Sequence, residues 1–243
     1  MSDTKLQELK NKLKQKEKEL KILFTVAQTI SGLDLDPILS TIVSIVSRVT
    51  KADSCFIYIM DSKKEELILR ASKNPHKTVL GRITMKIGEG ITGWVAREKK
   101  PVVINQKAST DSRFKLFPSL AEDRYEAFFS VPILNKHGVV GVINAQYKKK
   151  HIHTVGEVEL LSAIGQLVGG AVENARLVEE SLTLKEALET RKVIDKAKGI
   201  LMKKLHLSED EAYRKIQKQS MNMRKSARDI AEAIVVSEVL THS

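Results

Sequence analysis

The chain has little cysteine, proline and aromatic residue, and it lacks a long uninterrupted apolar run. Of 243 residues, one is cysteine, five are proline and 5% are aromatic. The single thiol, Cys55, excludes a disulfide and an all-cysteine zinc or iron–sulfur site within one chain, and its apolar neighbours predict a buried side chain. No segment reaches the roughly 18 consecutive apolar residues of a spanning helix, and the polar start is unlike a signal peptide. We therefore expect a cytoplasmic chain with no membrane association.

Positive charge is in excess, with a formal net charge of +11. Residues 182–243 carry thirteen Lys and Arg against nine acids, and residues 1–24 carry seven Lys against four acids. This distribution permits a polyanionic partner without establishing one.

Catalytic motifs are missing from the sequence. There is no phosphate-cradling glycine loop, no nucleophile motif and no HExxH spacing, and the three glycines before Trp94 lack the Lys-Ser/Thr of a nucleotide loop. We therefore expect a protein that is not an enzyme and carries no cofactor.

Four histidines are conceivable metal ligands. His151 and His153 are two residues apart, so an extended backbone would point both imidazoles the same way. However, a third ligand is not evident in the sequence, and lone histidines in polar loops more often face solvent. The sequence therefore predicts no metal site, at these two positions or at His76 and His137.

Hydrophobic periodicity predicts an α+β region between two helices with narrow apolar seams. A strict seam favours pairing with a second copy in a coiled coil over docking on the chain's own domain. Between them we expect helices at 38–49 and 94–97, and strands at 54–60, 66–71, 101–105, 128–134 and 138–147. A capping box, Thr154-x-x-Glu157, begins the second helix. The seams are Leu6, Leu9, Leu13, Lys16, Leu20, Leu23, Ala27 and Ile30, and Leu161, Ile164, Val168, Ala171, Ala175, Val178 and Leu182.

Five short motifs, taken in order, resemble those of GAF domains, which are α/β small-molecule sensors with a central antiparallel sheet. They are the segments 88–96, 111–114, 130–133, 141–144 and 172–177. The resemblance implies a sensory domain over residues 25–177, preceded by an N-terminal coiled-coil helix at residues 1–24.

A ligand pocket between the sheet and the irregular segment after residue 105 is also implied. The ligand is unknown; a cyclic nucleotide is disfavoured because Gln106, not Lys, follows Asn105. Plain core packing is an equal interpretation of the apolar members of the lining. The implied lining is Ile91, Trp94, Asp111, Phe114, Phe117, Phe129 and Asn144.

The tail reads as three helices, the first continuing the long helix to about Leu205. A capping box from Ser208 to Glu211 starts the second helix, and the segment from Ser226 to Asp229 can cap the third. Lys192, Lys196, Gly199 and Lys203 are spaced to share one helix stripe. A helical glycine costs about 0.8–1.0 kcal/mol relative to alanine, so Gly199 needs a reason, either a phosphate chain or a packed helix. The predicted core is Ile194, Ala197, Leu201, Leu205, Ala212, Ile216, Ala227, Ile230, Ala231 and Ile234.

The tail resembles ANTAR domains, which bind RNA in bacterial transcription antitermination. The resemblance rests on Ala197-Lys-Gly-Ile-Leu-Met202 followed by Ser208-Glu-Asp-Glu-Ala-Tyr213, and it departs from the family at Ser220 and Ala227. It implies an ANTAR domain over residues 178–243 that binds RNA stem-loops. Tyr213 is the tail's one aromatic residue, so base stacking would rest on it or on arginine. The candidate contacts are Arg191, Lys192, Lys196, Lys198, Gly199, Lys203, Tyr213, Arg214 and Lys218.

Taken together, the sequence predicts a GAF-type antiparallel sheet flanked by helices, joined by a long coiled-coil helix to a three-helix ANTAR domain. The predicted function is a homodimeric RNA-binding antitermination regulator, controlled by an unknown small molecule in the GAF pocket. A DNA-binding GAF regulator and a protein adaptor stay open as alternatives. An enzyme is the weakest rival.

Overall fold

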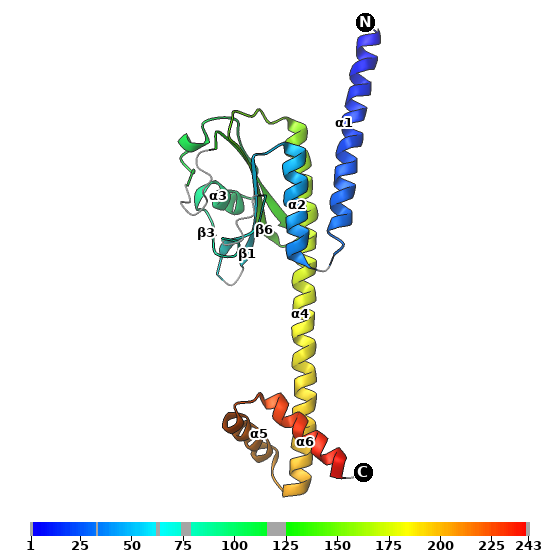
Figure 1. The fold of residues 1–243 in the computed structure, drawn as a ribbon, viewed down its shortest axis with the longest axis vertical. Helices are drawn as coiled ribbons and strands as arrows, with labels where there is room; N and C mark the ends of the chain where they lie inside the picture. The colour runs from blue at the N-terminus through cyan, green and yellow to red at the C-terminus, as the bar shows by residue number, and fades with distance from the viewer. Residues whose placement is uncertain (1, 33, 62–63, 74–78, 116–124, 242–243) are drawn as a thin grey trace. The chain divides into compact units, whose positions relative to one another are not determined.

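The computed structural model describes residues 2–32, 34–61, 64–73, 79–115 and 125–241 (Figure 1). The chain forms two compact units, Met1–Arg176 and Leu177–Ser243. The helices are α1 (Ser2–Thr29), α2 (Leu35–Thr50), α3 (Gly90–Glu98), the short 3₁₀ turn η1 (Ala108–Thr110), α4 (Val155–Leu205), α5 (Glu209–Met223) and α6 (Ala227–Thr241). The strands are β1 (Ser54–Asp61), β2 (Glu66–Ser72), β3 (Thr84–Lys86), β4 (Val102–Ile104), β5 (Ala127–Asn135) and β6 (Gly138–Tyr147).

The strands of the first unit form one sheet in the order β3-β2-β1-β6-β5-β4, with every neighbouring pair antiparallel. The predicted fold class, an antiparallel GAF-type sheet with flanking helices, a long helix and a helical tail, is therefore confirmed. Strand β3 was not expected, because its three residues are too few to show a period of two.

The sheet is covered on both faces (Figure 1). Helices α2 and α4 cover one face, where Ile42, Ile143 and Leu161 share a buried core. Helix α3 covers the other face, where Phe56 and Val95 belong to a second core. Successive strand residues alternate between the two cores, because side chains on a strand point to opposite faces in turn.

Two glycines bring α4 close to β5. A Cβ atom at Gly169 would lie 1.8 Å from the carbonyl oxygen of Leu134, and one at Gly165 would lie 2.7 Å from that of Pro132. The two glycines are four residues apart, so they share one face of the helix. Their missing side chains let α4 seat its apolar residues directly on the strand.

The apolar seam of α1 divides into two parts. Towards its C-terminal end α1 docks on its own domain, where Val26 is fully buried and Leu23 packs beside it. Nearer the N-terminus, Leu9 and Leu13 are 56% and 62% exposed. Lys16, the mismatch in the seam, pairs with Glu19 at 2.8 Å. Docking on the domain thus accounts for Leu23 and Ile30 and leaves the other seam residues, among them Leu6 and Leu20, exposed to solvent.

The seam of α4 also divides. Leu161, Ile164 and Val168 are buried in the sheet core, whereas Leu182 is 58% exposed. The expected coiled-coil interpretation is therefore wrong for the first part of α4, which is a core helix. Helix α4 contains a stretch that is long and apolar enough by composition to cross a membrane. Its mean hydropathy is 1.3, and 39% of the stretch is buried. The buried residues of α4, among them Leu161 and Val168, pack against the sheet, and a core helix of a folded domain can have the same composition.

The second unit is a small helical domain built from the end of α4 with α5 and α6. Its core is Ala197, Ile216, Ile230 and Ala231, with partly buried residues around them. Both expected helix caps form: the Glu211 amide donates to Ser208 Oγ at 3.3 Å, and the Asp229 amide donates to Ser226 Oγ at 3.1 Å. The predicted core is correct except at Leu205, which is 46% exposed.

Both departures from the ANTAR pattern have a place in this packing. The Ser220 hydroxyl donates to the Lys225 carbonyl oxygen at 2.6 Å and so satisfies backbone at the end of α5. Ala227 is half-buried and packs against the core. Neither departure leaves a gap that the structure shows.

Candidate nucleic-acid interface and sensor site

The α4 stripe, defined as Lys192, Lys196, Gly199 and Lys203, lies on the solvent side of the helix. All four residues are exposed. At about 3.6 residues per turn they fall roughly opposite the buried Ala197. The helix therefore turns its apolar side to the core and its lysines to water.

Two lysines of the stripe have no partner within the part of the chain that the structure describes. Lys192 pairs with Glu189 at 2.8 Å, but no ion pair of Lys196 or Lys203 is found among the described residues. Gly199 lies between them, and a Cβ atom there would meet no neighbouring atom within 4 Å. No helix of the described chain packs on Gly199, so internal packing does not explain this glycine.

Arg191 and Lys198 lie on the opposite flank of α4 in a network of carboxylates. Lys198 Nζ is 2.7 Å from Asp195 and 2.6 Å from Glu209, and only 15% of its side chain is exposed. The hydrogen bonds that Lys198 donates to Asp195 and Glu209 raise the pKa of Lys198. Arg191 lies 3.9 Å from the same Asp195. Lys198 therefore ties α4 to the start of α5, and it is less available to a phosphate than the lysines of the stripe.

Helix α5 adds a second group of polar side chains to this unit. Tyr213, Arg214 and Lys218 are all exposed, and the Tyr213 side chain is 42% exposed beside the buried Ala212. The one aromatic ring of the tail is therefore held by a packed helix and still faces water.

In the first unit, three of the residues predicted for a ligand pocket gather beside α3. The Arg113 side chain donates to Asp111 at 2.7 and 2.8 Å, and its guanidinium lies 4.6 Å above the Trp94 ring. The hydrogen bonds from Arg113 lower the pKa of Asp111. Phe114 is half-buried against the same core. The sequence analysis missed Arg113, although it lies inside the 111–114 motif.

Asn144 is buried, and both its amide oxygen and its amide nitrogen form hydrogen bonds within its own domain. It accepts a hydrogen bond from Ser130 Oγ at 2.7 Å and donates one to Thr92 Oγ1 at 2.8 Å. These two hydrogen bonds link β5, β6 and α3. Asn144 therefore has a structural role in this structure, and Ile91 is likewise buried in the core of that face.

Phe129 does not lie with the other predicted pocket residues. It is fully buried on the α2 and α4 face, while its neighbour Phe128 belongs to the α3 face. The prediction of Phe129 as a pocket residue is therefore wrong by one position, because adjacent residues of a strand point to opposite faces of the sheet. Phe117 lies outside the described residues, so its expected place in the lining stays a prediction.

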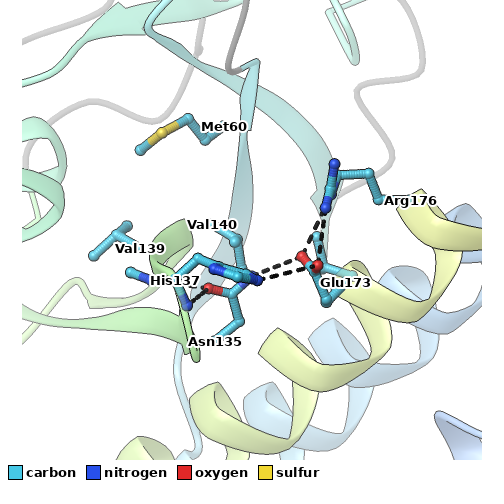
Figure 2. A pocket seen from close by; sticks show the side chains of 9 residues that line it. Met60, Asn135, His137, Val139, Val140, Glu173 and Arg176 are labelled. Carbon is cyan, nitrogen blue, oxygen red and sulfur yellow. Dashed lines mark hydrogen bonds and ion pairs between the residues drawn. The ribbon is translucent and has the colours of Figure 1, made fainter. Parts of the chain in front are cut away.

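A cavity of about 330 Å³ lies instead between the β5–β6 turn and α4 (Figure 2). Glu173 lines this cavity, and it accepts hydrogen bonds from Asn135 Nδ2 at 2.8 Å and from Arg176 at 2.9 Å. Hydrogen bonding to Arg176 lowers the pKa of Glu173. His137 Nε2 is 3.8 Å from the same carboxylate. The polar members satisfy one another, and no sequence motif pointed to this cavity.

The sequence analysis expected the histidines of the loop before α4 to face solvent, but in the structure they do not. His151 and His153 are both half-buried, and burial is the main cause that lowers the pKa of His153 to about 4. His137 is exposed, as expected, and His76 lies outside the described residues.

The amino-acid sequence matches two known families in the same order as the two units. Residues 32–173 match the GAF domain, and residues 182–235 match the ANTAR domain. The chain belongs to the GAF family. With its second domain it is a GAF–ANTAR protein, and both domains are regulatory.

Similar proteins agree with this assignment. The nitrogen fixation protein AnfA of Azotobacter vinelandii is 28% identical over 185 residues, which cover 72% of this chain and 35% of that protein. The transcriptional regulatory protein PdtaR of Mycobacterium tuberculosis is 36% identical over 77 residues, covering 32% of this chain and 38% of PdtaR. The chain thus spans little more than a third of either relative. The GAF domain of a phosphoenolpyruvate-protein phosphotransferase from Coxiella burnetii has the same fold, with a TM-score of 0.62 at 24% identity, over 67% of this chain and 96% of that one.

Proposed function

We propose that this GAF–ANTAR protein is a cytoplasmic, RNA-binding regulator of transcription antitermination. The observation that carries the proposal is the exposed α4 stripe, with its two unpaired lysines on either side of an open glycine. Phosphate contacts by lysine supply most of the affinity for a nucleic acid, and a glycine lets the phosphate chain approach the helix closely. The ANTAR match over the same residues supports this assignment.

The second contact surface is on α5, where Tyr213, Arg214 and Lys218 face solvent. An exposed tyrosine and an arginine plane can stack on unpaired bases, which a hairpin loop offers and a continuous duplex does not. The helix that follows, α6, begins Ala227-Arg-Asp-Ile-Ala and carries few side chains that read base edges. We therefore favour RNA loops over duplex DNA. We place Lys198 outside the contact set, because its ammonium already binds two carboxylates.

The GAF domain is proposed to control this interaction by sensing a small molecule or another signal. Helix α4 belongs to the cores of both domains, through Leu161 and Val168 in the first and Ala197 in the second. A ligand that binds one arrangement of the sheet and α4 better than another shifts the population of that arrangement. The group formed by Trp94, Asp111 and Arg113 is the proposed place of contact for that ligand.

The test is the affinity for an RNA stem-loop, measured as a function of salt concentration for the full chain. Replacing Lys196 and Lys203 with glutamate should weaken hairpin binding at least about tenfold, and replacing them with alanine should reduce the log–log salt slope by about 1 per lysine. The matched control replaces the exposed Lys12 and Lys14 of α1 with glutamate, which changes the net charge equally.

The outcomes separate the alternatives. Loss of binding in the stripe variants but not in the α1 control supports the proposal. If duplex DNA competes with the hairpin equally well, a DNA-binding regulator is favoured. If the stripe variants bind the hairpin as the wild type does, a protein adaptor is favoured. Circular dichroism of each variant confirms that the helices persist.

A further inference from the structure

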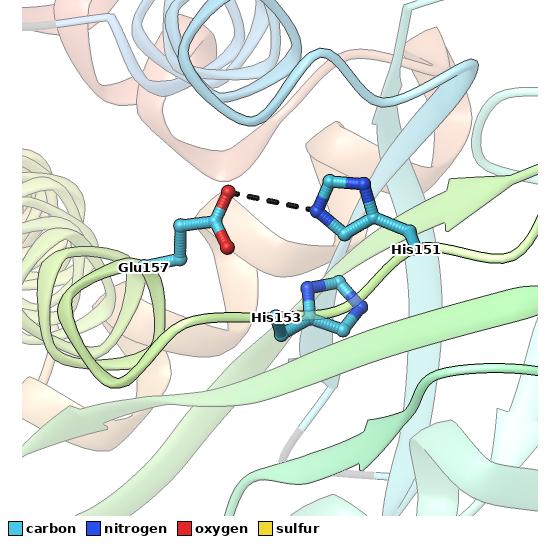
Figure 3. A group of neighbouring side chains, drawn as sticks. All are labelled: His151, His153 and Glu157. Carbon is cyan, nitrogen blue, oxygen red and sulfur yellow. Dashed lines mark ion pairs between the residues drawn. The ribbon is translucent and has the colours of Figure 1, made fainter.

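The loop between β6 and α4 brings two imidazoles and a carboxylate together (Figure 3). His151 and His153 come from the loop, and Glu157 comes from the first turn of α4. One ligand atom from each lies within 4.8 Å of the others. His151 Nε2 is 3.5 Å from Glu157 Oε1. Sequence spacing pointed to the two histidines, whereas Glu157 had been assigned only to the helix cap.

Each member of this group is held in place by a separate contact. The backbone amides of His151 and His153 donate to the carbonyl and side-chain oxygens of Asn105, at 3.0 and 3.2 Å. The His151 ring stacks on Tyr147 with centroids 4.1 Å apart, and the His153 ring lies 4.9 Å from that of Phe129. Both imidazoles are therefore oriented before any ligand arrives.

Glu157 is oriented by the capping box of α4. Its Oε2 atom accepts from the Thr154 amide at 2.8 Å and from the Thr154 hydroxyl at 3.3 Å. The other oxygen, Oε1, is the atom that faces His151. One carboxylate oxygen is thus fixed by Thr154, and the other is free to bind a cation; hydrogen bonds of this kind orient the carboxylate ligands of metal sites.

The imidazole nitrogens of this cluster are short of partners. His151 Nε2 and both ring nitrogens of His153 are buried atoms without a hydrogen bond among the described residues. Buried polar atoms are nearly always satisfied in folded proteins, and leaving one without a partner is destabilising. The nearest charge, Glu157, offers an acceptor to His151, yet nothing in the described chain satisfies His153.

From this arrangement we propose that His151, His153 and Glu157 bind a divalent transition-metal ion of the zinc class. Two imidazole nitrogens with one carboxylate oxygen form a ligand set that zinc and its neighbours favour, whereas calcium and magnesium take oxygen ligands. Zinc ligands at about 2.0–2.2 Å from the metal stand roughly 3.3 Å apart in a tetrahedron. The 3.5 Å between His151 and Glu157 already matches that spacing.

The proposed ion would join the β6–α4 loop to the first turn of α4. Three protein ligands leave the fourth tetrahedral position to water or to a ligand from outside. The His151 and Glu157 side chains are 27% and 28% exposed, although the imidazole nitrogens themselves are buried. Lys148, Lys149 and Lys150 precede the site but are exposed, with their charges in water. The site is independent of the RNA-binding proposal.

The experiment is a calorimetric titration of the untagged, chelator-treated full chain with zinc chloride at neutral pH. We expect about one ion per chain, with affinity lowered at least about tenfold in His153→Gln and in His151→Gln. Glu157→Gln should also weaken binding while keeping the helix cap, because glutamine serves in a capping box. Magnesium and calcium chloride should give no binding under the same conditions.

His137→Gln is the matched control, because His137 also faces a glutamate, at 3.8 Å, but has no second histidine in the group. Zinc should raise the melting temperature of the wild-type chain and of this control, but not that of His151→Gln. If His153→Gln does not fold, His151→Gln and Glu157→Gln carry the test. The proposal is overturned if the wild-type chain takes up no stoichiometric zinc, or if uptake survives in these variants or disappears in the control.

Discussion

At the scale of single residues, burial decides which groups can react. Cys55 lies in β1 with no exposed surface, and burial raises the pKa of its thiol to about 12. The thiolate is the nucleophile, so a thiol held neutral by its surroundings is inert. At this position the sequence prediction of a buried cysteine is confirmed.

We expect Cys55 to resist alkylating and disulfide reagents at pH 8 while the chain is folded. At four pH units below its pKa, only about one thiol in ten thousand is ionised. Full labelling should follow unfolding in guanidinium chloride. The measurement is the time course of thiol labelling, and since the chain holds one cysteine the signal reports this residue alone. Rapid stoichiometric labelling of the folded chain would contradict the burial described above.

At the scale of elements, glycines on α4 have opposite roles. Gly169 lies against the Leu134 carbonyl oxygen, whereas Gly170 and Gly199 have no neighbouring atom within 4 Å of a Cβ position. The same residue type in the same helix therefore marks a close approach at Gly169, as at Gly165, and an open surface at Gly170 and Gly199. Only the tertiary contacts distinguish these cases.

Alanine substitutions at these glycines should have effects of opposite sign. Gly169→Ala should lower the free energy of unfolding by about 1–3 kcal/mol, because backbone must move to admit the methyl group. Gly170→Ala and Gly199→Ala should each raise it by up to about 0.8–1.0 kcal/mol through helix propensity. Denaturant unfolding followed by circular dichroism measures all three. Equal effects of Gly169→Ala and Gly170→Ala would show that α4 does not pack closely on β5.

At the scale of the whole molecule, the exposed part of the α1 seam bears on assembly. Leu6, Leu9, Leu13 and Leu20 are all more than half exposed. A row of leucines at alternating steps of three and four is the pattern of a two-stranded coiled coil. Its exposure in a single chain supports the proposal that a second copy covers it.

We expect light scattering after size-exclusion chromatography to give the mass of a dimer. Replacing Leu9 and Leu13 with lysine should yield a monomer whose GAF domain stays folded, because neither side chain belongs to its core. The control replaces Gln7 and Lys14, which lie off the seam, with alanine, and it should stay dimeric. A wild-type chain that is monomeric at micromolar concentration would rule out pairing through α1.

The sequence by itself determined the two families and the order of the elements other than β3 and η1. Periodicity, capping boxes and ordered motifs are local signals, so the antiparallel sheet, the long helix and the three tail helices could be predicted from them. The same holds for the lysine stripe, because residues spaced by three and four share a face of any helix.

The tertiary structure alone decided which of these residues meet. It placed Phe129 on the face opposite Trp94, tied Lys198 to Glu209, and buried the first part of the α4 seam, whose whole length the sequence had assigned to a coiled coil. It also brought Glu157, a residue of the capping box of α4, close to two histidines. Strand register and contacts between elements depend on packing across the whole core, and no local pattern in the sequence contains them.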